Sequence, residues 1–241
     1  MSVGQSNRPV VVVAGDDAPD VLGIECISDL LKINGLDPSA GPVHCSTLIE
    51  LHVSGGGGDD LLDLSRIDAG LLALHDEDVP PDITLDGGPG KDTLLAGGAV
   101  GQATGGPGAD TIRALGPFAA VNGGPGADRV NTGSGLDFVF GGPGGDRVDS
   151  GGGPDLVFGE GGRDRLQGGE GGDTLAGGGG RDVLLGGPGK DGLFGGSGRD
   201  TLLGGPGKDK ESQEGSALAA LLGLDNTAVL SRIRSELRLQ N

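Results

Sequence analysis

The chain of 241 residues has no tryptophan and no tyrosine, and its five phenylalanines leave aromatic residues at 2%. Basic residues are also scarce, because 17 of them face 35 acidic residues and leave a net charge of −18. Such an excess of negative charge argues against nucleic acid as a partner, since a phosphate backbone would be repelled. No apolar run approaches the roughly 18 residues that a membrane-spanning helix needs, so we expect no membrane span. The run from Val10 to Ala14 is too short for the core of a signal peptide and predicts a buried strand.

The chain is rich in glycine, and the glycines recur at regular intervals along the sequence. From Gly87 to Ser212 a pattern of nine residues repeats 14 times without losing phase, and it reads Gly-Gly-x-Gly-x-Asp-x-apolar-x. The unit from Gly87 to Leu95, for example, is Gly-Gly-Pro-Gly-Lys-Asp-Thr-Leu-Leu. A content of 55 glycines and 14 prolines would by itself indicate a low-complexity segment. The sustained period indicates a stacked repeat fold instead.

Two positions of the unit carry most of the information. The sixth position is aspartate in 12 of the 14 units and fails only at Gly101 and Ala119. The aspartates are Asp92, Asp110, Asp128, Asp137, Asp146, Asp155, Asp164, Asp173, Asp182, Asp191, Asp200 and Asp209. The eighth position is apolar in 13 units and fails only at Glu211. Because side chains alternate between the faces of a strand, each unit predicts a six-residue turn followed by a short strand with one inward residue.

This unit resembles the RTX, or hemolysin-type, calcium-binding nonapeptide repeat, and the resemblance covers residues 87–212. In that family two units form one coil of a right-handed parallel β-roll, so the resemblance implies an all-β solenoid that binds calcium. Calcium needs six to eight oxygen ligands, which two stacked turns can supply and one turn cannot. The resemblance also implies a secreted or cell-surface protein, because RTX proteins are typically exported without a cleaved N-terminal signal.

If alternate units stack, the aspartates divide between two edges of the solenoid. One edge has aspartate in every unit from Asp92 to Asp200, whereas the other begins with Gly101 and Ala119 and is regular only from Asp137 onward. The gaps between stacked aspartates predict six sites on the first edge and four on the second, about ten calcium ions in all.

Calcium is expected to drive folding as well as to bind. Thirteen inward aliphatic side chains make a narrow core, while a long segment rich in glycine must be ordered. The ladders of aspartate add repulsion between like charges. We therefore predict that folding depends on the free energy of metal binding.

Residues 1–86 predict degenerate coils that cap the N-terminal end of the same solenoid. The string from Gly55 to Asp63 fits the nonapeptide, and it makes Asp60 a further candidate calcium ligand. This string is out of phase with the array that starts at Gly87, so it must be followed by an irregular coil or an insertion.

Residues 213–241, which follow the array of residues 87–212, change in composition and carry apolar residues at helical spacing. They predict a helical segment. It could cap the last coil, form a remnant of a secretion signal, or associate with another chain.

Cys26 and Cys45 are separated in the sequence by about the length of one coil of two units. If the N-terminal part is coiled, they could lie on neighbouring coils and form a disulfide. Two buried free thiols are the favoured interpretation.

The outward positions of one sheet collect phenylalanine, namely Phe138, Phe140, Phe158 and Phe194. Soluble monomers seldom expose such a patch, so it predicts a contact with a protein partner, another copy of the chain or the C-terminal helix. Scattered exposed apolar residues are the alternative.

On the other sheet, arginine recurs at coil spacing at positions 129, 147 and 165. A solvated face with flanking aspartates offsetting the charge is the favoured interpretation. An anion or acidic-polysaccharide site is the alternative.

No set of residues predicts catalysis. The string Gly90-Lys91 is followed by Asp92, where a phosphate-binding loop needs serine or threonine. We therefore expect a non-enzymatic, calcium-binding extracellular β-roll with a structural or interaction role. The alternatives are an RTX module that helps to export and fold a secreted effector, such as a protease, lipase, epimerase or toxin, and an adhesion or surface-layer solenoid.

Overall fold

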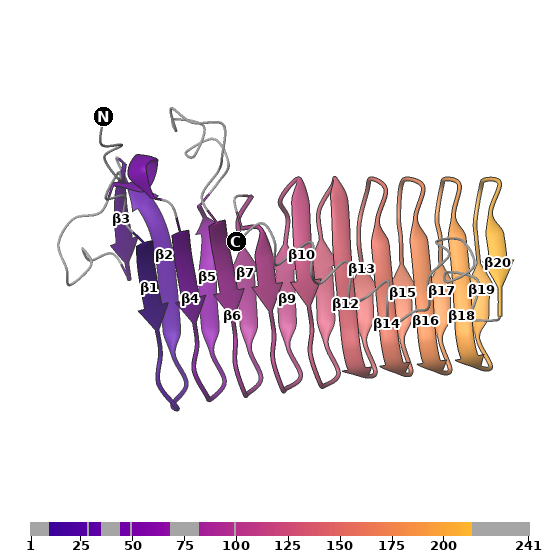
Figure 1. The fold of residues 1–241 in the computed structure, drawn as a ribbon, viewed down its shortest axis with the longest axis horizontal. Helices are drawn as coiled ribbons and strands as arrows, with labels where there is room; N and C mark the ends of the chain where they lie inside the picture. The colour runs from indigo at the N-terminus through magenta and orange to yellow at the C-terminus, as the bar shows by residue number, and fades with distance from the viewer. Residues whose placement is uncertain are drawn as a thin grey trace, which may run out of the picture.

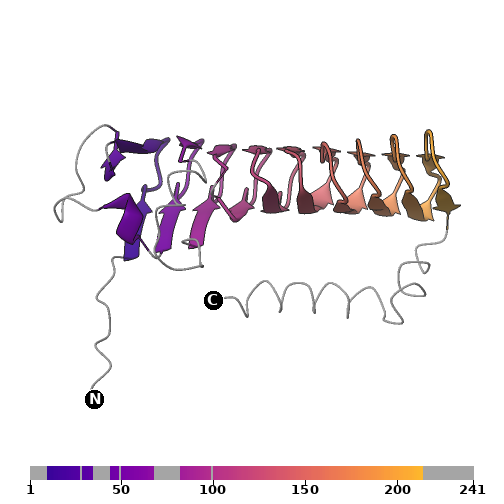
Figure 2. The same ribbon diagram turned by 90° about the horizontal axis from the view of Figure 1, so that it is seen from above.

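The computed structural model describes residues 10–27, 29–34, 44–48, 50–67, 82–98 and 100–213. These residues form an elongated parallel β-solenoid made of two ten-stranded sheets (Figure 1). Seen from above, the sheets are two thin layers that face each other along the whole length (Figure 2). The predicted all-β solenoid is therefore confirmed. The described ranges hold no helix with the length and apolar character that crossing a bilayer takes.

The strands of each sheet follow one another along the solenoid. Sheet A contains, in order, β1 (Val10–Ala14), β4 (Glu50–Ser54), β6 (Asp82–Asp86), β8 (Gln102–Thr104), β10 (Phe118–Asn122), β12 (Leu136–Gly144), β14 (Leu156–Gly162), β16 (Thr174–Gly180), β18 (Gly192–Gly198) and β20 (Lys210–Ser212). Sheet B contains, in order, β3 (Leu30–Ile33), β2 (Val21–Ile27), β5 (Leu61–Arg66), β7 (Thr93–Ala96), β9 (Thr111–Ala114), β11 (Arg129–Thr132), β13 (Arg147–Asp149), β15 (Arg165–Gln167), β17 (Val183–Leu185) and β19 (Thr201–Leu203). Neighbouring strands are parallel except for the antiparallel pair β2 and β3.

From β7 onward, each coil is two nonapeptides long. In sheet B, Val130 of β11 lies opposite Val148 of β13, which lies opposite Leu166 of β15. Each step equals two units of the repeat, and sheet A shows the same step in the pairing of Val139 with Val157. One unit of a coil therefore enters sheet B and the next enters sheet A, as the repeat predicts.

The core lies between the two sheets and consists of inward side chains that each sheet contributes along the length of the solenoid. The eighth positions of the units are buried there: Leu94, Ile112, Val130, Val148, Leu166 and Leu184 from sheet B, and Ala103, Val121, Val139, Val157, Leu175 and Leu193 from sheet A. Leu202, in the last coil of sheet B, is only partly buried. The inward position predicted from strand alternation is confirmed.

The N-terminal coils join the same two sheets with longer connections. Leu61 of β5 lies opposite Thr93 of β7, and Val21 of β2 lies opposite Leu61, so both of these coils are longer than two units. The extra length of the coil that starts at Leu61 falls between β5 and β6, where the sequence requires an irregular coil or an insertion. The extra length of the coil that starts at Val21 includes β3 and the short 3-10 helix η1 (Cys45–Thr47).

Cys26 and Cys45 form a disulfide, so the prediction of two free thiols is wrong. They do not lie on neighbouring coils, because the chain after β2 turns back as the antiparallel strand β3. The backbone N–H of Cys45 then donates to the carbonyl of Asp29 in the turn between these strands, at 3.0 Å. This local hairpin brings η1 against β2 and places the two thiols together.

The phenylalanine side chains on the outward positions of sheet A are not an open patch. Phe140, Phe158 and Phe194 are 5%, 6% and 2% exposed, so these outward rings are covered and not open to solvent. The rings of Phe140 and Phe158 stack, with centroids 5.3 Å apart. Phe194 lies over Gly192 of its own strand, and Phe138 is half-buried beside Phe118. The predicted C-terminal helix, residues 213–241, lies outside the described residues beyond Gln213.

Candidate calcium sites along two edges

The turns of the nonapeptide stack too closely for ordinary side chains. The second glycine of the unit has positive φ, as in Gly106 (φ 101°) and Gly124 (φ 99°). A Cβ atom on Gly124 would lie 2.4 Å from the carbonyl oxygen of Gly106 in the preceding coil. Backbone conformation and the close approach of successive turns therefore both favour glycine here, although Glu160 takes the same position of its unit with φ 72°.

One carboxylate oxygen of each repeat aspartate is used to hold the turns together. Oδ1 of Asp128 accepts a hydrogen bond from the backbone N–H of Asp110 at 2.8 Å, and Oδ1 of Asp146 accepts one from Asp128 at 2.9 Å. On the first edge this ladder joins Asp60, Asp92, Asp110, Asp128, Asp146, Asp164, Asp182 and Asp200, with distances of 2.8–3.0 Å. The turns are thus locked in register by the same residues that carry the charge.

The second edge shows the same ladder, starting later. Oδ1 of Asp137 accepts a hydrogen bond from the backbone N–H of Ala119 at 2.7 Å, and the pattern continues through Asp155, Asp173, Asp191 and Asp209. The division of the aspartates between two edges, at steps of two units, is therefore confirmed. Ala119 keeps its place in the backbone ladder but brings no carboxylate.

The other carboxylate oxygen, Oδ2, is buried and without a hydrogen-bond partner in 12 aspartates. These are Asp60, Asp92, Asp110, Asp128, Asp137, Asp146, Asp155, Asp164, Asp173, Asp182, Asp191 and Asp200. A buried carboxylate oxygen with no partner is strongly unfavourable, because it loses its hydration and gains no hydrogen bond in return. The repetition of one orphaned oxygen at every step indicates that a cation belongs there.

At most of the orphaned oxygens, a backbone carbonyl of the neighbouring coil converges on the same place. Around Gly105, a Cβ atom would meet the carbonyl oxygen of Gly123 at 2.5 Å and Oδ2 of Asp110 at 2.6 Å. The second edge repeats this at Gly186, where a Cβ atom would lie 2.5 Å both from the carbonyl oxygen of Gly204 and from Oδ2 of Asp191. Each cradle therefore combines oxygens from two successive coils.

The second edge closes two of these cradles with hydroxyl groups. The first position of the unit is glycine in ten of the 14 units and alanine at Ala96 and Ala114, but it is threonine at residue 132 and serine at residue 150. The hydroxyl of Thr132 donates to the carbonyl of Ser150 at 2.9 Å, and that of Ser150 donates to the carbonyl of Gly168 at 2.9 Å. The carbonyls of Gly123 and Gly204 are their counterparts at glycine positions, and each of those accepts a hydrogen bond from a backbone N–H and none from a hydroxyl.

Burial also changes the acidity of the ladder. It raises the pKa of Asp92, Asp110, Asp128, Asp146 and Asp155 to about 6 and that of Asp164 to about 7. The hydrogen bonds to backbone N–H groups act in the opposite direction, but desolvation is the larger effect. The charged form is therefore unfavourable in the folded chain unless a cation compensates it.

The donor set fits calcium. Calcium takes six to eight hard oxygen ligands in a flexible arrangement, and each cradle offers carboxylate and carbonyl oxygens only. In the part of the chain that the structure describes, no group of three or more His, Cys, Asp or Glu side chains gathers in one place. Turn carbonyls would therefore supply most of the ligands, and magnesium, which demands a small rigid octahedron, fits less well.

The structure adds three findings about the aspartates of the candidate calcium sites. Asp60 stacks on Asp92 despite its different phase in the sequence. Asp209, at the end of the second edge, is half-buried and has no following coil. Asp20 was not predicted, yet its backbone N–H donates to Oδ1 of Asp60 at 2.7 Å and extends the first edge. The signal for Asp20 is the glycine that precedes it at Gly15, with the spacing of the repeat, and apolar Val21 and Leu22 after it.

A comparison with protein families agrees with this geometry. The model of the RTX calcium-binding nonapeptide repeat, four copies long, matches residues 122–157, 158–193 and 185–210. The search of curated proteins gives no match. The matched residues contain stacked aspartates of both edges, so residues 122–210 of this chain carry the RTX calcium-binding nonapeptide repeat.

Proposed function

We propose that this protein is an extracellular calcium-binding β-roll whose folding is coupled to calcium, and that its role is structural or one of interaction. The observation that carries the proposal is the row of buried Oδ2 atoms without partners along both edges. Their desolvation opposes folding at neutral pH. Bound calcium would turn this cost into a favourable term and make metal binding part of the folding free energy.

Two features support a location outside the cell. Extracellular calcium-binding modules work with dissociation constants of roughly 10⁻⁴–10⁻³ M, which suits many weak sites that act together. The disulfide between Cys26 and Cys45 supports the same location, because disulfides persist in oxidising compartments and are rare in the cytosol.

The proposal includes no enzymatic activity. A histidine, a serine and a carboxylate do meet near η1, but the Ser46 hydroxyl donates to Oδ2 of Asp29 at 2.8 Å, and Nδ1 of His44 lies 3.0 Å from the same oxygen. The serine hydroxyl therefore donates its hydrogen bond to the carboxylate and not to the imidazole. This arrangement supports a structural clasp on the turn before β3, and not an activated nucleophile.

A role in interaction remains part of the proposal, although the burial of Phe140, Phe158 and Phe194 weakens the case for a protein partner on sheet A. An export and folding module for a secreted effector would use the same calcium-coupled roll.

The test is a far-UV circular dichroism titration of calcium-free protein, with calcium and magnesium in parallel. We expect a transition from disorder to β structure with calcium and none with magnesium. A chain that is already folded without calcium would refute the coupling.

Asp146→Asn and Asp149→Asn form a matched pair for this titration. Both remove one negative charge, but only Asp146 carries a buried orphaned oxygen, and Asp149 lies at the end of strand β13. We expect Asp146→Asn to weaken calcium-dependent stability by about 1–3 kcal/mol and Asp149→Asn to leave it nearly unchanged.

A further inference from the structure

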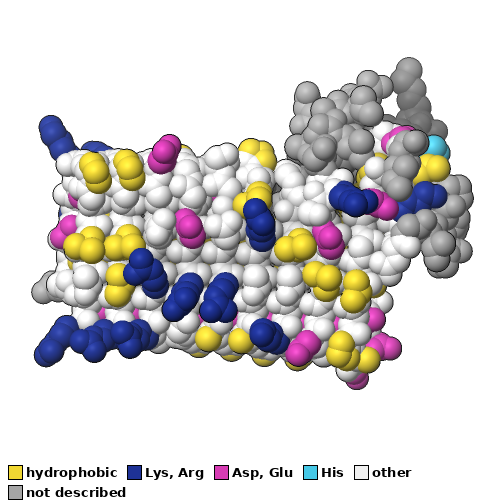
Figure 3. All heavy atoms as spheres, turned by 180° about the vertical axis from the view of Figure 1, so that it is seen from behind, with side chains coloured by type: hydrophobic (Ala, Val, Ile, Leu, Met, Phe, Trp, Pro, Cys, Tyr) yellow, Lys and Arg dark blue, Asp and Glu magenta, His cyan; other side chains and the backbone are white. Residues whose placement is uncertain are grey.

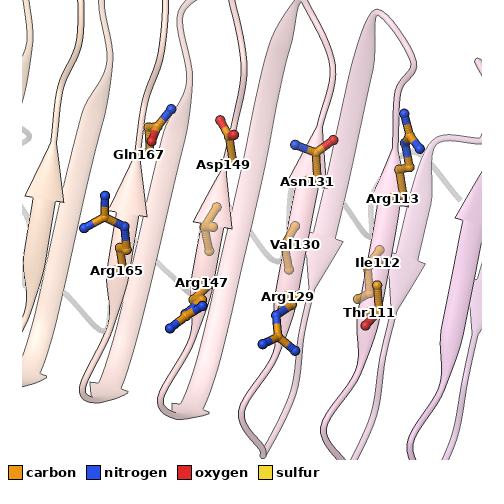
Figure 4. A pocket seen from close by; sticks show the side chains of 11 residues that line it. Thr111, Ile112, Arg113, Arg129, Val130, Asn131, Arg147, Asp149, Arg165 and Gln167 are labelled. Carbon is orange, nitrogen blue, oxygen red and sulfur yellow. The ribbon is translucent and has the colours of Figure 1, made fainter.

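The outer face of sheet B carries a shallow groove of about 710 Å³ that crosses four strands, β9, β11, β13 and β15. Two rows of side chains line it, one on each side of the inward residues Ile112 and Val130 (Figure 4). One row consists of Thr111, Arg129, Arg147 and Arg165, and the other of Arg113, Asn131, Asp149 and Gln167.

The three arginines of the first row stand directly beside one another. Arg129 is in register with Arg147, and Arg147 with Arg165, so neighbouring positions are one strand spacing, about 4.8 Å, apart. All three are exposed. The space-filling view from behind shows basic side chains side by side across the middle of the solenoid (Figure 3).

These three arginines have no ion-pair partner among the described residues. Within the described ranges, none of the three forms an ion pair or a side-chain hydrogen bond, including with Asp149 across the groove. Flanking aspartates therefore do not offset these charges through direct ion pairs among the described residues. Like charges at this spacing repel, and a chain with a net charge of −18 has many acidic residues that could have paired with them.

We propose that this groove binds an acidic polysaccharide whose chain runs along the solenoid axis, across the strands. The arginine row would hold successive carboxylate or sulfate groups, because guanidinium is the side chain best suited to bind such oxyanions in pairs of hydrogen bonds. The polar row of Asn131, Asp149 and Gln167 would face the sugar hydroxyls.

The groove favours a polysaccharide over a single-stranded nucleic acid. Sites for single strands use aromatic side chains on which the bases stack, and the lining of this groove contains none. The row is also short, because the next residues along it are Val183 and Thr201 in β17 and β19. The three guanidinium groups of this row, with Arg113 on the opposite side of the groove, define a site for an oligosaccharide segment of a few sugars.

The test measures binding of a fluorescent chondroitin sulfate hexasaccharide to the full chain in saturating calcium, which keeps the roll folded. The site variant is Arg129→Gln with Arg147→Gln and Arg165→Gln. The matched control is Arg163→Gln with Arg181→Gln and Arg199→Gln. The control arginines are also exposed and recur at coil spacing, but they lie on the turns and outside the groove. Both variants have the same net charge.

We expect the site variant to weaken binding about tenfold or more and the control to change it less than about twofold. Equal weakening in both variants would reduce the effect to net charge and overturn the proposal, as would no binding by the unaltered chain. Equally tight binding of an oligothymidylate of the same charge would overturn the assignment to polysaccharide. Circular dichroism in calcium separates these outcomes from a failure of the calcium-coupled fold.

Discussion

At the scale of single residues, each repeat aspartate divides its two oxygens between two tasks. In Asp128, Oδ1 accepts the backbone N–H of Asp110, and Oδ2 is buried without a partner. The first oxygen fixes the register of the coils, and the second is left for a ligand from outside the chain. A side chain with only one oxygen could do either task but not both, which explains why the position is so regular.

The raised pKa values of the ladder predict a pH dependence with a definite sign. Burial raises the pKa of Asp110 to about 6 and that of Asp164 to about 7 in the folded, calcium-free chain, against about 3.9 in an unfolded chain. Between these values the folded state binds more protons, so the calcium-free roll gains stability as pH falls from about 7 to about 4 and loses it as pH rises through 6 to 7. Protons and calcium therefore compete for the same oxygens.

We expect the midpoint of calcium-induced folding to shift to higher calcium concentration when pH is lowered from 7.5 to 5.5. We also expect calcium binding at pH 6 to release protons. Calcium titrations followed by circular dichroism at both pH values, together with proton release into weak buffer, measure this. An unchanged midpoint with no released protons would show that the carboxylates are not the ligands.

The hydroxyls on the second edge make a second prediction at residue scale. Because Thr132 and Ser150 use their hydroxyls on the carbonyls that line open cradles elsewhere, those two positions are expected to be poor calcium sites. Thr132→Gly with Ser150→Gly should add about two bound calcium ions. Native mass spectrometry in calcium counts them.

Ser197→Gly is the control for that experiment, because it removes a hydroxyl from an exposed position of a first-edge turn. It should leave the count unchanged. If the double variant binds no more calcium than the unaltered chain, the hydroxyls do not close the cradles.

At the scale of the elements, the turns lie directly on one another and the strands of sheet B between them are short. The three-residue strand β13 buries one side chain, Val148, whereas β12 and β14 extend into the following turns and pair there, as Gly142 does with Glu160. Stability at this scale depends on how closely one turn can lie on the next.

Gly124→Ala tests the closeness of the turns. The added methyl group would lie 2.4 Å from the Gly106 carbonyl and would need positive φ, so we expect a loss of stability of about 2 kcal/mol or more. Gly101→Ala is the matched control, since a Cβ there would meet nothing within 4 Å. Chemical unfolding in saturating calcium compares the two. Similar losses in both variants would mean that glycine acts only through chain flexibility.

At the scale of the whole molecule, the solenoid is a one-dimensional stack in which each coil touches only its neighbours. A local change should therefore have a local effect. Reduction of the Cys26–Cys45 disulfide is expected to lower hydrogen-exchange protection in β2 and β3 and to leave the strands from β7 onward unchanged. Exchange measured by mass spectrometry in calcium, with and without reductant, tests this. Loss of protection along the whole stack would show that the N-terminal coils nucleate the fold.

The array was predictable because its information is local and repeated. The aspartate at the sixth position of nearly every unit and the apolar residue at the eighth predict the turn and the inward face without knowledge of distant contacts. With the coil of two units that the resemblance implies, they also predict the two edges. The N-terminal coils were less predictable. They are longer than two units and break the period, so only the pairing of Val21 with Leu61 and of Leu61 with Thr93 shows that they continue the same sheets.

The sequence by itself determined the repeating unit, its inward apolar position and the aspartates of the array that are candidate calcium ligands, because a period of nine puts equivalent residues in equivalent places. The coil of two units followed from the resemblance to the RTX repeat. Only the tertiary structure decided which oxygen of each aspartate stays free, that Cys26 pairs with Cys45, that Phe140 and Phe158 are buried, and that the arginine row has no acidic partner among the described residues. The physical reason is that these properties depend on distances between side chains of different coils. A repeat pattern fixes which coils are neighbours, but it does not fix how their side chains meet.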